Sequence, residues 1–315
     1  MDIRYLLFLQ ELRNGIHDAW TPFMEWISHF AVVYLICIPA VIYWCMDKKK
    51  GFYILASVLT ARMVNAVIKL TACVYRPWIR DSRVIPVGGA LREATGYSFP
   101  SGHTVTATPI YGGIAATYGK KRKVIAVICV MLLFVTGFSR NYLGVHTPQD
   151  VIFAMLIGGF ILLGMSKMLV FLEKHPEKED LFLLAGCMIT IVALVYITVK
   201  PYPTDYVDGV LLVNPRKMMQ DGYRDICALG AFCVARYIEK HFVKFQATGF
   251  RAKGVALAGV GSMLILLISR RLPGPLDEAL GAPWGKVIAR MLMIFFIVTI
   301  WPAVIKWCNK RSVAG

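Results

Sequence analysis

Residues 139–150 read SRNYLGVHTPQD and form a polar joint between two long apolar stretches, at about 124–139 and 151–171. The joint contains a serine, an arginine, a histidine and an aspartate. Ionisable groups are costly near hydrocarbon and tend to mark function. The pattern therefore predicts two apolar helices that meet at a functional site.

The composition of the whole chain predicts an all-α polytopic membrane protein. The 315 residues are 57% hydrophobic and 17% charged, with a mean hydropathy of +0.59, whereas globular chains carry about 25% charged residues. The net charge of +16 fits membrane topology and an anionic ligand, because no soluble basic face exists for nucleic acid. We expect no nucleic-acid partner, and composition assigns no oligomeric state.

Nine apolar runs predict membrane helices, since a bilayer core of ~30 Å needs about 20 residues per helix. The runs at 103–119 and 225–243 are the weakest, being short or interrupted by polar residues. The other runs lie at 24–46, 52–73, 124–139, 151–171, 181–199, 254–269 and 287–307. We expect an interfacial N-terminal helix within 1–22, a six-helix core at 23–199, and a C-terminal extension at 200–315 with about three further transmembrane helices.

Basic loops predict the orientation. Dense Lys and Arg clusters alternate with the other set of loops and should face the cytoplasm. This places the N-terminus outside, the C-terminus inside, and the loops at 74–102, 140–147, 200–224 and 270–286 on the external side. No removable signal peptide is expected, and the eight cysteines are interpreted as unpaired packing residues.

Two further polar segments fall on the same external side as the opening stretch. Lys69 and Arg76 are seven positions apart, so they share one helix face if the helix continues to Pro77. Pro100-Ser101-Gly102-His103 opens the next span. A helix start of this kind is expected to aim the backbone N–H groups of residues 101–103 at an anion.

Together these segments predict a phosphoryl-transfer site. Lys69, Arg76 and Arg140 supply positive charge for a tetrahedral oxyanion, and His103 and His146 accompany them. Phosphoryl transfer needs charge stabilisation, a nucleophile and an acid for the leaving group. We expect no metal and no other cofactor, because carboxylates are few and the histidines have cationic neighbours.

The three segments resemble the signature motifs of the type 2 phosphatidic acid phosphatase superfamily, complete and in order. They are Lys69 with Arg76-Pro77, Pro100-Ser101-Gly102-His103, and Ser139-Arg140 with His146 and Asp150. The resemblance implies that His146 attacks phosphorus and becomes a phosphohistidine, that Asp150 orients its imidazole, and that His103 protonates the leaving oxygen. It implies phosphate binding by Lys69, Arg76, Ser101, Gly102 and Arg140, with Ser139 supporting Arg140 and with Pro77 and Pro100 as supporting residues.

Several residues have alternative interpretations. Thr147-Pro148-Gln149-Asp150 also reads as a helix cap, so Asp150 could serve both purposes. Arg62 is interpreted as half of a buried ion pair with Glu25 or Asp225 rather than as a substrate contact. Arg80 or Arg83 could help bind a second phosphate or a headgroup.

We therefore expect an integral membrane phosphatase that needs no metal and hydrolyses a lipid phosphate monoester or pyrophosphate on the non-cytoplasmic face. Candidate substrates are undecaprenyl pyrophosphate, phosphatidic acid and phosphatidylglycerophosphate. A soluble sugar phosphate is the alternative, because the span count resembles the glucose-6-phosphatase branch. A lipid phosphotransferase is a further alternative. A transporter or scaffold with a degenerate site is the non-enzyme hypothesis, against which the complete motif set argues.

Overall fold

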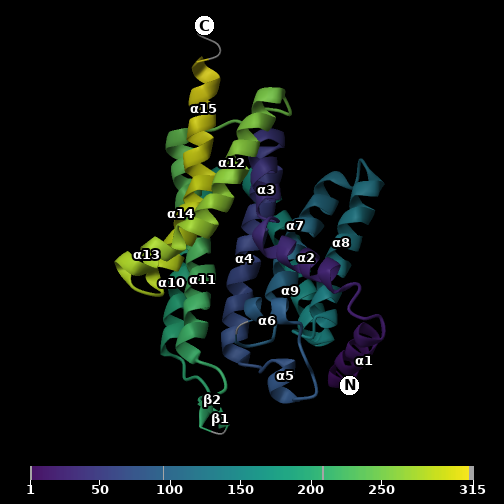
Figure 1. Cartoon of the computed structure of the whole chain (residues 1–315). Helices are drawn as coiled ribbons and strands as arrows, with labels where there is room; N and C mark the ends of the chain where they lie inside the picture. Colours follow the sequence, from purple (N-terminus) through teal and green to yellow (C-terminus); the bar gives the residue numbers. More distant parts are fainter. Residues whose placement is uncertain (1, 95, 208, 312–315) are drawn as a thin grey trace.

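A computed structural model describes residues 2–94, 96–207 and 209–311, and these are predominantly helical (Figure 1). Their two short strands, β1 (Tyr206–Val207) and β2 (Val210–Leu211), pair as an antiparallel hairpin. The helices are α1 (Asp2–Gly15), α2 (Thr21–Val33), α3 (Cys37–Val41), α4 (Lys48–Ala72), α5 (Pro77–Arg80), α6 (Gly88–Glu93), α7 (Gly102–Tyr118), α8 (Lys123–Tyr142), α9 (Pro148–Lys174), α10 (Glu179–Val199), α11 (Pro215–Ile238), α12 (Ala252–Arg271), α13 (Pro273–Leu280), α14 (Trp284–Phe295) and α15 (Trp301–Arg311). Short 3-10 or π segments occupy Ile42–Met46, Pro176–Lys178, Glu239–Val243 and Phe296–Ile300.

Helix forms at each of the nine predicted spans, which confirms an all-α polytopic membrane protein. Within the described residues, six helical segments are long and apolar enough to cross a membrane, and α2 with the α3 segment adds a seventh if this pair, bent by 45°, counts as one span. The two weakest predictions, α7 and α11, fall outside that set. α7 has only 17 residues, and α11 carries charged side chains, among them Arg224, Asp225 and Arg236.

α4 lies at the centre of the bundle. Its first turn is capped by Asp47, whose carboxylate accepts hydrogen bonds from the N–H groups of Lys49 and Lys50. α4 packs against α7 and α9 and also against α11. One hydrophobic cluster includes Leu55 of α4, Phe232 of α11 and Ile305 of α15. The C-terminal extension and the helices that carry the motifs therefore share a core.

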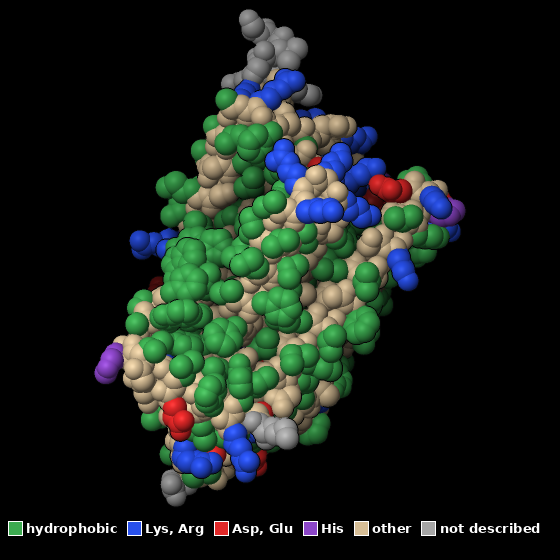
Figure 2. Space-filling view, turned by 90° about the vertical axis from the view of Figure 1, so that its right-hand side faces the viewer, with side chains coloured by type: hydrophobic (Ala, Val, Ile, Leu, Met, Phe, Trp, Pro, Cys, Tyr) green, Lys and Arg blue, Asp and Glu red, His purple; other side chains and the backbone are tan. Residues whose placement is uncertain are grey.

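The outer helices present apolar side chains to their surroundings, as a bilayer requires. Phe160 of α9 and Val199 of α10 are 71% and 72% exposed. Figure 2 shows hydrophobic side chains over the middle of one face, with Lys and Arg gathered toward its two ends. This arrangement matches a hydrocarbon belt between two aqueous layers.

The predicted external loops that carry α5 and the β1–β2 hairpin lie at one end of the molecule, called the motif end below, whereas α13 in the predicted loop at 270–286 lies nearer the middle (Figure 1). The N-terminus, α5 and the β1–β2 hairpin lie there, whereas the C-terminus lies at the opposite end (Figure 1). α1 packs against α8 at the motif end. Arg13 of α1 donates hydrogen bonds to the carbonyls of Tyr142 and Ile85, which ties the N-terminal helix to the loops around the motifs.

Candidate active site

A cavity of about 350 Å³ at the motif end brings the three motifs together. Its lining comes from α4, α7, α8, the loop before α9, and α11, together with Arg76 just before α5. The motif side chains in this lining are those of Lys69, Arg76, His103, Arg140 and His146, together with Gly102.

The condition under which Lys69 and Arg76 would share one helix face is not met, because α4 stops before Pro77. α4 ends at Ala72, and Cys73 adopts a left-handed conformation with φ of 49° while its N–H bonds to the Lys69 carbonyl. Arg76 is extended, as a residue before proline prefers to be. The two cations still line one cavity.

Lys69 and Arg76 are held by backbone carbonyls. Lys69 Nζ donates to the carbonyl oxygens of Tyr97 and Ser98, each at 3.2 Å. Arg76 is buried, and its guanidinium donates to the carbonyl of Val145 at 2.8 Å. These partners are uncharged, so they orient the two cations without neutralising them.

Arg140 is fully buried near the end of α8. Its guanidinium donates to Ser28 Oγ of α2, a contact that sequence reasoning missed because 112 residues separate the two. Ser139 Oγ donates to the Thr136 carbonyl one turn earlier at 2.8 Å. The Ser139 hydroxyl thus bonds to its own helix, and its support of Arg140 stays a prediction.

The second motif caps α7. Ser101 Oγ accepts hydrogen bonds from the N–H of Thr104 at 3.4 Å and from its hydroxyl at 3.0 Å. The N–H of Ser101 donates to the carbonyl of Asp150 at 3.0 Å, so the expectation that it points at an anion is wrong. Gly102 and His103 supply first-turn N–H groups, and a Cβ at Gly102 would meet no atom within 4 Å.

His146 is 1% exposed and is held on both ring nitrogens. Nδ1 lies 3.2 Å from Asp150 Oδ2, and Nε2 lies 3.0 Å from the Arg76 guanidinium. Asn141 Nδ2 also donates to the His146 carbonyl at 2.9 Å. Burial, and then the positive charge of Arg76, lower the pKa of His146 well below its usual 6.5. The imidazole is therefore neutral, and His146 lines the cavity in this form.

Asp150 makes both kinds of contact expected from the sequence. Its carboxylate accepts from the N–H of Thr147 at 2.9 Å, the Thr147 hydroxyl accepts from the N–H of Asp150, and a capping box is formed. The same oxygen faces His146 Nδ1. Ser98 Oγ donates to it at 2.5 Å. Ser98 was missed as a site residue, although its position two residues before Pro100 was the available signal.

The other arginines form ion pairs. Arg62 lies 2.6 Å from Asp225, which confirms the expected buried pair. Arg80 pairs with Asp2 at 2.8 Å, and Arg83 pairs with Asp81 at 2.7 Å. Neither Arg80 nor Arg83 belongs to the described lining of the active-site cavity. The hypothesis that they bind a second phosphate therefore has no support in these contacts.

The cysteines and the other possible metal ligands form neither disulfides nor a metal site within the described residues. All eight cysteines are free thiols, as expected. Across residues 2–94, 96–207 and 209–311, no three His, Cys, Asp or Glu side chains come together in a way that could hold a metal ion.

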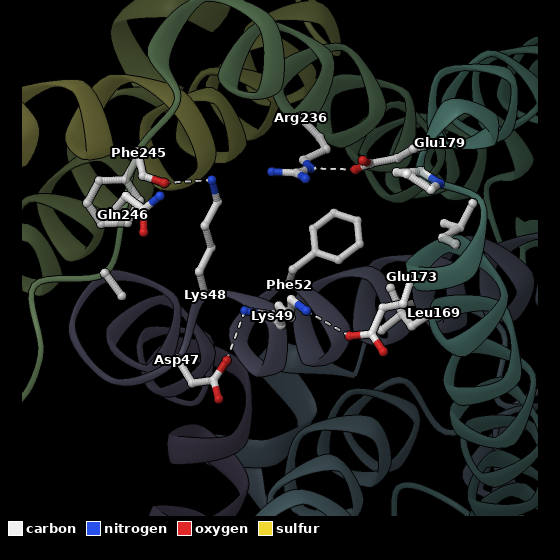
Figure 3. Close-up of a pocket in the computed structure, with 13 residues that line it drawn as sticks. Asp47, Lys48, Lys49, Phe52, Leu169, Glu173, Glu179, Arg236, Phe245 and Gln246 are labelled. Carbon is white, nitrogen blue, oxygen red and sulfur yellow. Dashed lines mark hydrogen bonds and ion pairs between the residues drawn. The ribbon is translucent and has the colours of Figure 1, made fainter.

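A larger cavity, of about 690 Å³, lies at the end opposite the motifs, between the start of α4 and the end of α9 (Figure 3). Its charged side chains are matched by partners. Lys49 lies 3.0 Å from Glu173, and Arg236 lies 2.8 Å from Glu179. Lys48 lies 2.7 Å from the buried Glu239. In the motif cavity, by contrast, Lys69 and Arg76 donate to uncharged carbonyl groups.

Comparison with known proteins agrees with the motif geometry. The PAP2 superfamily model matches residues 50–174, which contain all three motifs. Phosphatidylglycerophosphatase B of Bacillus subtilis (strain 168) is 31% identical over 179 residues, which cover 55% of this chain and 77% of that protein. The chain belongs to the PAP2 superfamily.

Two other PAP2-family relatives are more distant. Lipid A 4'-phosphatase of Bacteroides thetaiotaomicron is 26% identical over 51% of this chain and 73% of that protein. Undecaprenyl-diphosphatase of Sulfolobus acidocaldarius is 30% identical over 36% of this chain and 52% of that protein. No solved structure gives a significant match. Family membership together with the apolar helices makes this chain an integral membrane phosphate-ester hydrolase, which favours the enzyme over the transporter or scaffold hypothesis.

Proposed function

We propose that the chain hydrolyses a lipid phosphate monoester or pyrophosphate through a phosphohistidine on His146. The observation that carries the proposal is the placement of His146. Nδ1 is held by Asp150 while Nε2 faces a cavity lined by Lys69, Arg76 and Arg140. A nucleophile oriented by a carboxylate beside three cations is the arrangement that phosphoryl transfer requires.

In the first step, Nε2 of His146 attacks phosphorus, and the bond from phosphorus to the leaving oxygen breaks. Lys69, Arg76 and Arg140 stabilise the equatorial oxygens, together with the N–H groups of residues 102 and 103. Asp150 stabilises the positive imidazole through Nδ1–H. His103, which lines the same cavity, gives its proton to the leaving oxygen.

In the second step, water attacks the phosphohistidine and the P–N bond breaks. His103, now neutral, takes a proton from the water, because the group that acts as acid in one direction acts as base in the next. His146 returns to its neutral form and inorganic phosphate leaves. Release to water rather than to an acceptor alcohol makes the chain a hydrolase, not a phosphotransferase.

The lipid class of the substrate rests on the relatives and on the surroundings of the site. Each of the three relatives is named for action on a lipid phosphate, and the cavity lies within a bundle with apolar outer faces. We infer that residues 23–199 form the phosphatase core. We also infer that the motif end faces the non-cytoplasmic side, since the dense basic loops lie toward the other end.

Replacement of His146 tests the mechanism. Purified His146→Ala should release no phosphate from lipid phosphates and should retain no radiolabelled phosphate after rapid quenching during turnover. The wild-type protein should release phosphate and should retain the radiolabel, with EDTA present. His175→Ala is the matched control, because His175 lies in the exposed loop after α9. Undiminished turnover by His146→Ala would refute the phosphohistidine. Faster hydrolysis of soluble sugar phosphates than of any lipid phosphate would refute the lipid class.

A further inference from the structure

A separate small cavity, called the extension cavity below, lies among the helices that follow the family match. Its volume is about 190 Å³, and its lining comes from α11, α12, the start of α13, and α14. α13 joins the ends of α12 and α14 that lie away from the C-terminus (Figure 1). None of the described lining belongs to residues 50–174, which the family model matches. The extension cavity is therefore built without the motif-bearing helices.

Three cationic side chains line the extension cavity, and its described lining includes no carboxylate. They are Arg224 of α11 and Lys286 and Arg290 of α14. Ser269 is the hydroxyl residue of this lining, and its Oγ donates to the carbonyl of Leu266 in its own helix at 3.0 Å. Like charges in one small cavity repel each other, so this lining favours an anion.

Acidic side chains beside the extension cavity only partly balance these charges. Arg224 lies 3.4 Å from Asp221 and 3.8 Å from Asp225, and its Nε has no hydrogen-bond partner among the described residues. Lys286 Nζ lies 3.6 Å from Asp277. These separations exceed the length of a normal N–H···O hydrogen bond, about 2.7–3.2 Å. The cations therefore keep N–H groups that a ligand could use.

Arg290 is the least compensated of the three cations. Its guanidinium forms no hydrogen bond or ion pair with another described residue. The charged groups that act on it are Arg62 and Arg224, which repel it, and Asp225, which lies 2.6 Å from Arg62. Arg290 is six residues after Trp284, where α14 begins, so it lies about 9 Å along the helix. A cation inside a membrane helix is costly without a counter-charge and tends to mark a ligand site.

Packing between α11, α13 and α14 fixes the walls of the extension cavity. Tyr223 of α11 stacks on Trp284 of α14, with ring centroids 5.9 Å apart and an interplanar angle of 11°. A Cβ at Gly285 would lie 2.1 Å from the backbone nitrogen of Asp277 in α13. The N–H of Lys286 donates to Asp277 Oδ1 at 3.0 Å. The cations beside these contacts are therefore placed before any ligand binds, which favours binding.

We propose that Arg224, Lys286 and Arg290 bind a phosphate group, in a second anion site beside the active site. Arginine binds phosphate oxygens in pairs through its planar guanidinium, and lysine adds a point charge. The cavity has room for one phosphate group, since a water molecule occupies about 30 Å³ in the liquid. Arg224 also lines the active-site cavity, so the bound anion lies next to it. The phosphate belongs either to an anionic phospholipid headgroup or to inorganic phosphate.

Thermal unfolding of the full-length protein in nanodiscs tests the site. Each protein carries Lys69→Ala, which weakens phosphate binding by the proposed catalytic residues. One probe is inorganic phosphate, which replaces chloride at constant ionic strength in phosphatidylcholine discs. The other is phosphatidylglycerol added to the discs, a phosphodiester that a monoester phosphatase does not hydrolyse. A ligand that binds the folded state raises the unfolding midpoint, so a midpoint that rises only with phosphate indicates the free anion, and one that rises with phosphatidylglycerol indicates the headgroup.

Substitutions in the lining should remove this stabilisation. Arg290→Gln and Lys286→Gln should each weaken the apparent Kd of the effective probe about tenfold. Arg271→Gln is the matched control, because Arg271 is exposed at the end of α12 outside the described lining, and it should leave the Kd unchanged. Lys286 is 57% exposed, so its variant tests the site even if Arg290→Gln does not fold.

Two outcomes would overturn the inference. Neither probe could raise the midpoint of the reference protein, or both lining variants could respond as Arg271→Gln does, which would indicate a general effect of negative charge. The measurement involves no turnover. The phosphohistidine mechanism therefore stands or falls separately, on the activity of His146→Ala.

Discussion

In the proposed mechanism, the surroundings of His146 set the pH range of the reaction. Its imidazole is buried and lies beside Arg76, and both features favour the neutral form. Asp150 and Ser98 contact Nδ1 on the other side of the ring. The proposed chemistry therefore depends on contacts made by single side chains, and two predictions belong to this scale.

The first prediction concerns the acid limb of activity. Because the pKa of His146 is lowered below 6.5, Nε2 keeps its lone pair as the pH falls through 6.5, and kcat/KM should decline only at lower pH. Arg76→Gln removes the neighbouring positive charge, which should raise the pKa and move the acid limb of the residual activity to higher pH. The substrate phosphate titrates equally for both proteins, so comparing their pH profiles of kcat/KM isolates His146. Coincident limbs would contradict this account.

The second prediction concerns Ser98. Its hydroxyl donates to the carboxylate of Asp150, and hydrogen bonds to charged groups contribute roughly 1.5–3 kcal/mol. Ser98→Ala should therefore lower kcat about tenfold or more with little change in KM. The same substitution at the exposed Ser269 of α12 is the control. A higher KM at unchanged kcat would show that Ser98 helps to bind phosphate and does not position Asp150.

At the level of elements, α4 and α11 are joined by a charged pair inside the bundle. The side chains of Arg62 and Asp225 are 18% and 14% exposed, and Arg62 also donates to Thr106 of α7 at 2.8 Å. The pair therefore connects three helices that surround the active-site cavity. Such a pair is costly to break, because the remaining charge stays in a medium of low polarity.

Asp225→Ala should lower the stability of the protein by about 3–5 kcal/mol, seen as a lower thermal unfolding midpoint in detergent. Adding Arg62→Met should recover part of the loss, since the unpaired charge is removed. Asp81→Ala is the comparison, because the Arg83–Asp81 pair is exposed at the motif end and should matter little. Equal shifts for the two aspartate variants would indicate that the α4–α11 pair adds no stability.

For the whole molecule, the two ends of the bundle should face different sides of the membrane. Ile85 is 62% exposed at the motif end, and Lys121 is exposed in the loop between α7 and α8. In a background without the eight native cysteines, an impermeant thiol reagent added to intact cells should label Ile85→Cys but not Lys121→Cys. Labelling of Lys121→Cys alone would invert the proposed orientation.

Local patterns determined the helices and predicted the site residues. Apolar runs of bilayer length predicted helix at all nine places, because in hydrocarbon each backbone group must be satisfied within its own helix. The predicted topology placed Lys69, His103 and His146 on one side of the membrane, and all three line one cavity. The capping signal at Thr147 and Asp150 was also local, and the cap is present.

Tertiary contacts decided what local patterns do not encode. Just after α4 ends, the carbonyl of Val74 accepts a hydrogen bond from the N–H of the distant Ser98. The Ser28–Arg140 bond joins residues 112 positions apart, and α11 completes the cavity although it carries no motif. Sequence by itself thus predicted which groups do chemistry, from residue type and short spacing. Packing between distant segments decided which atoms remain available to a substrate, because each hydrogen bond made within the fold removes a donor or acceptor from the site.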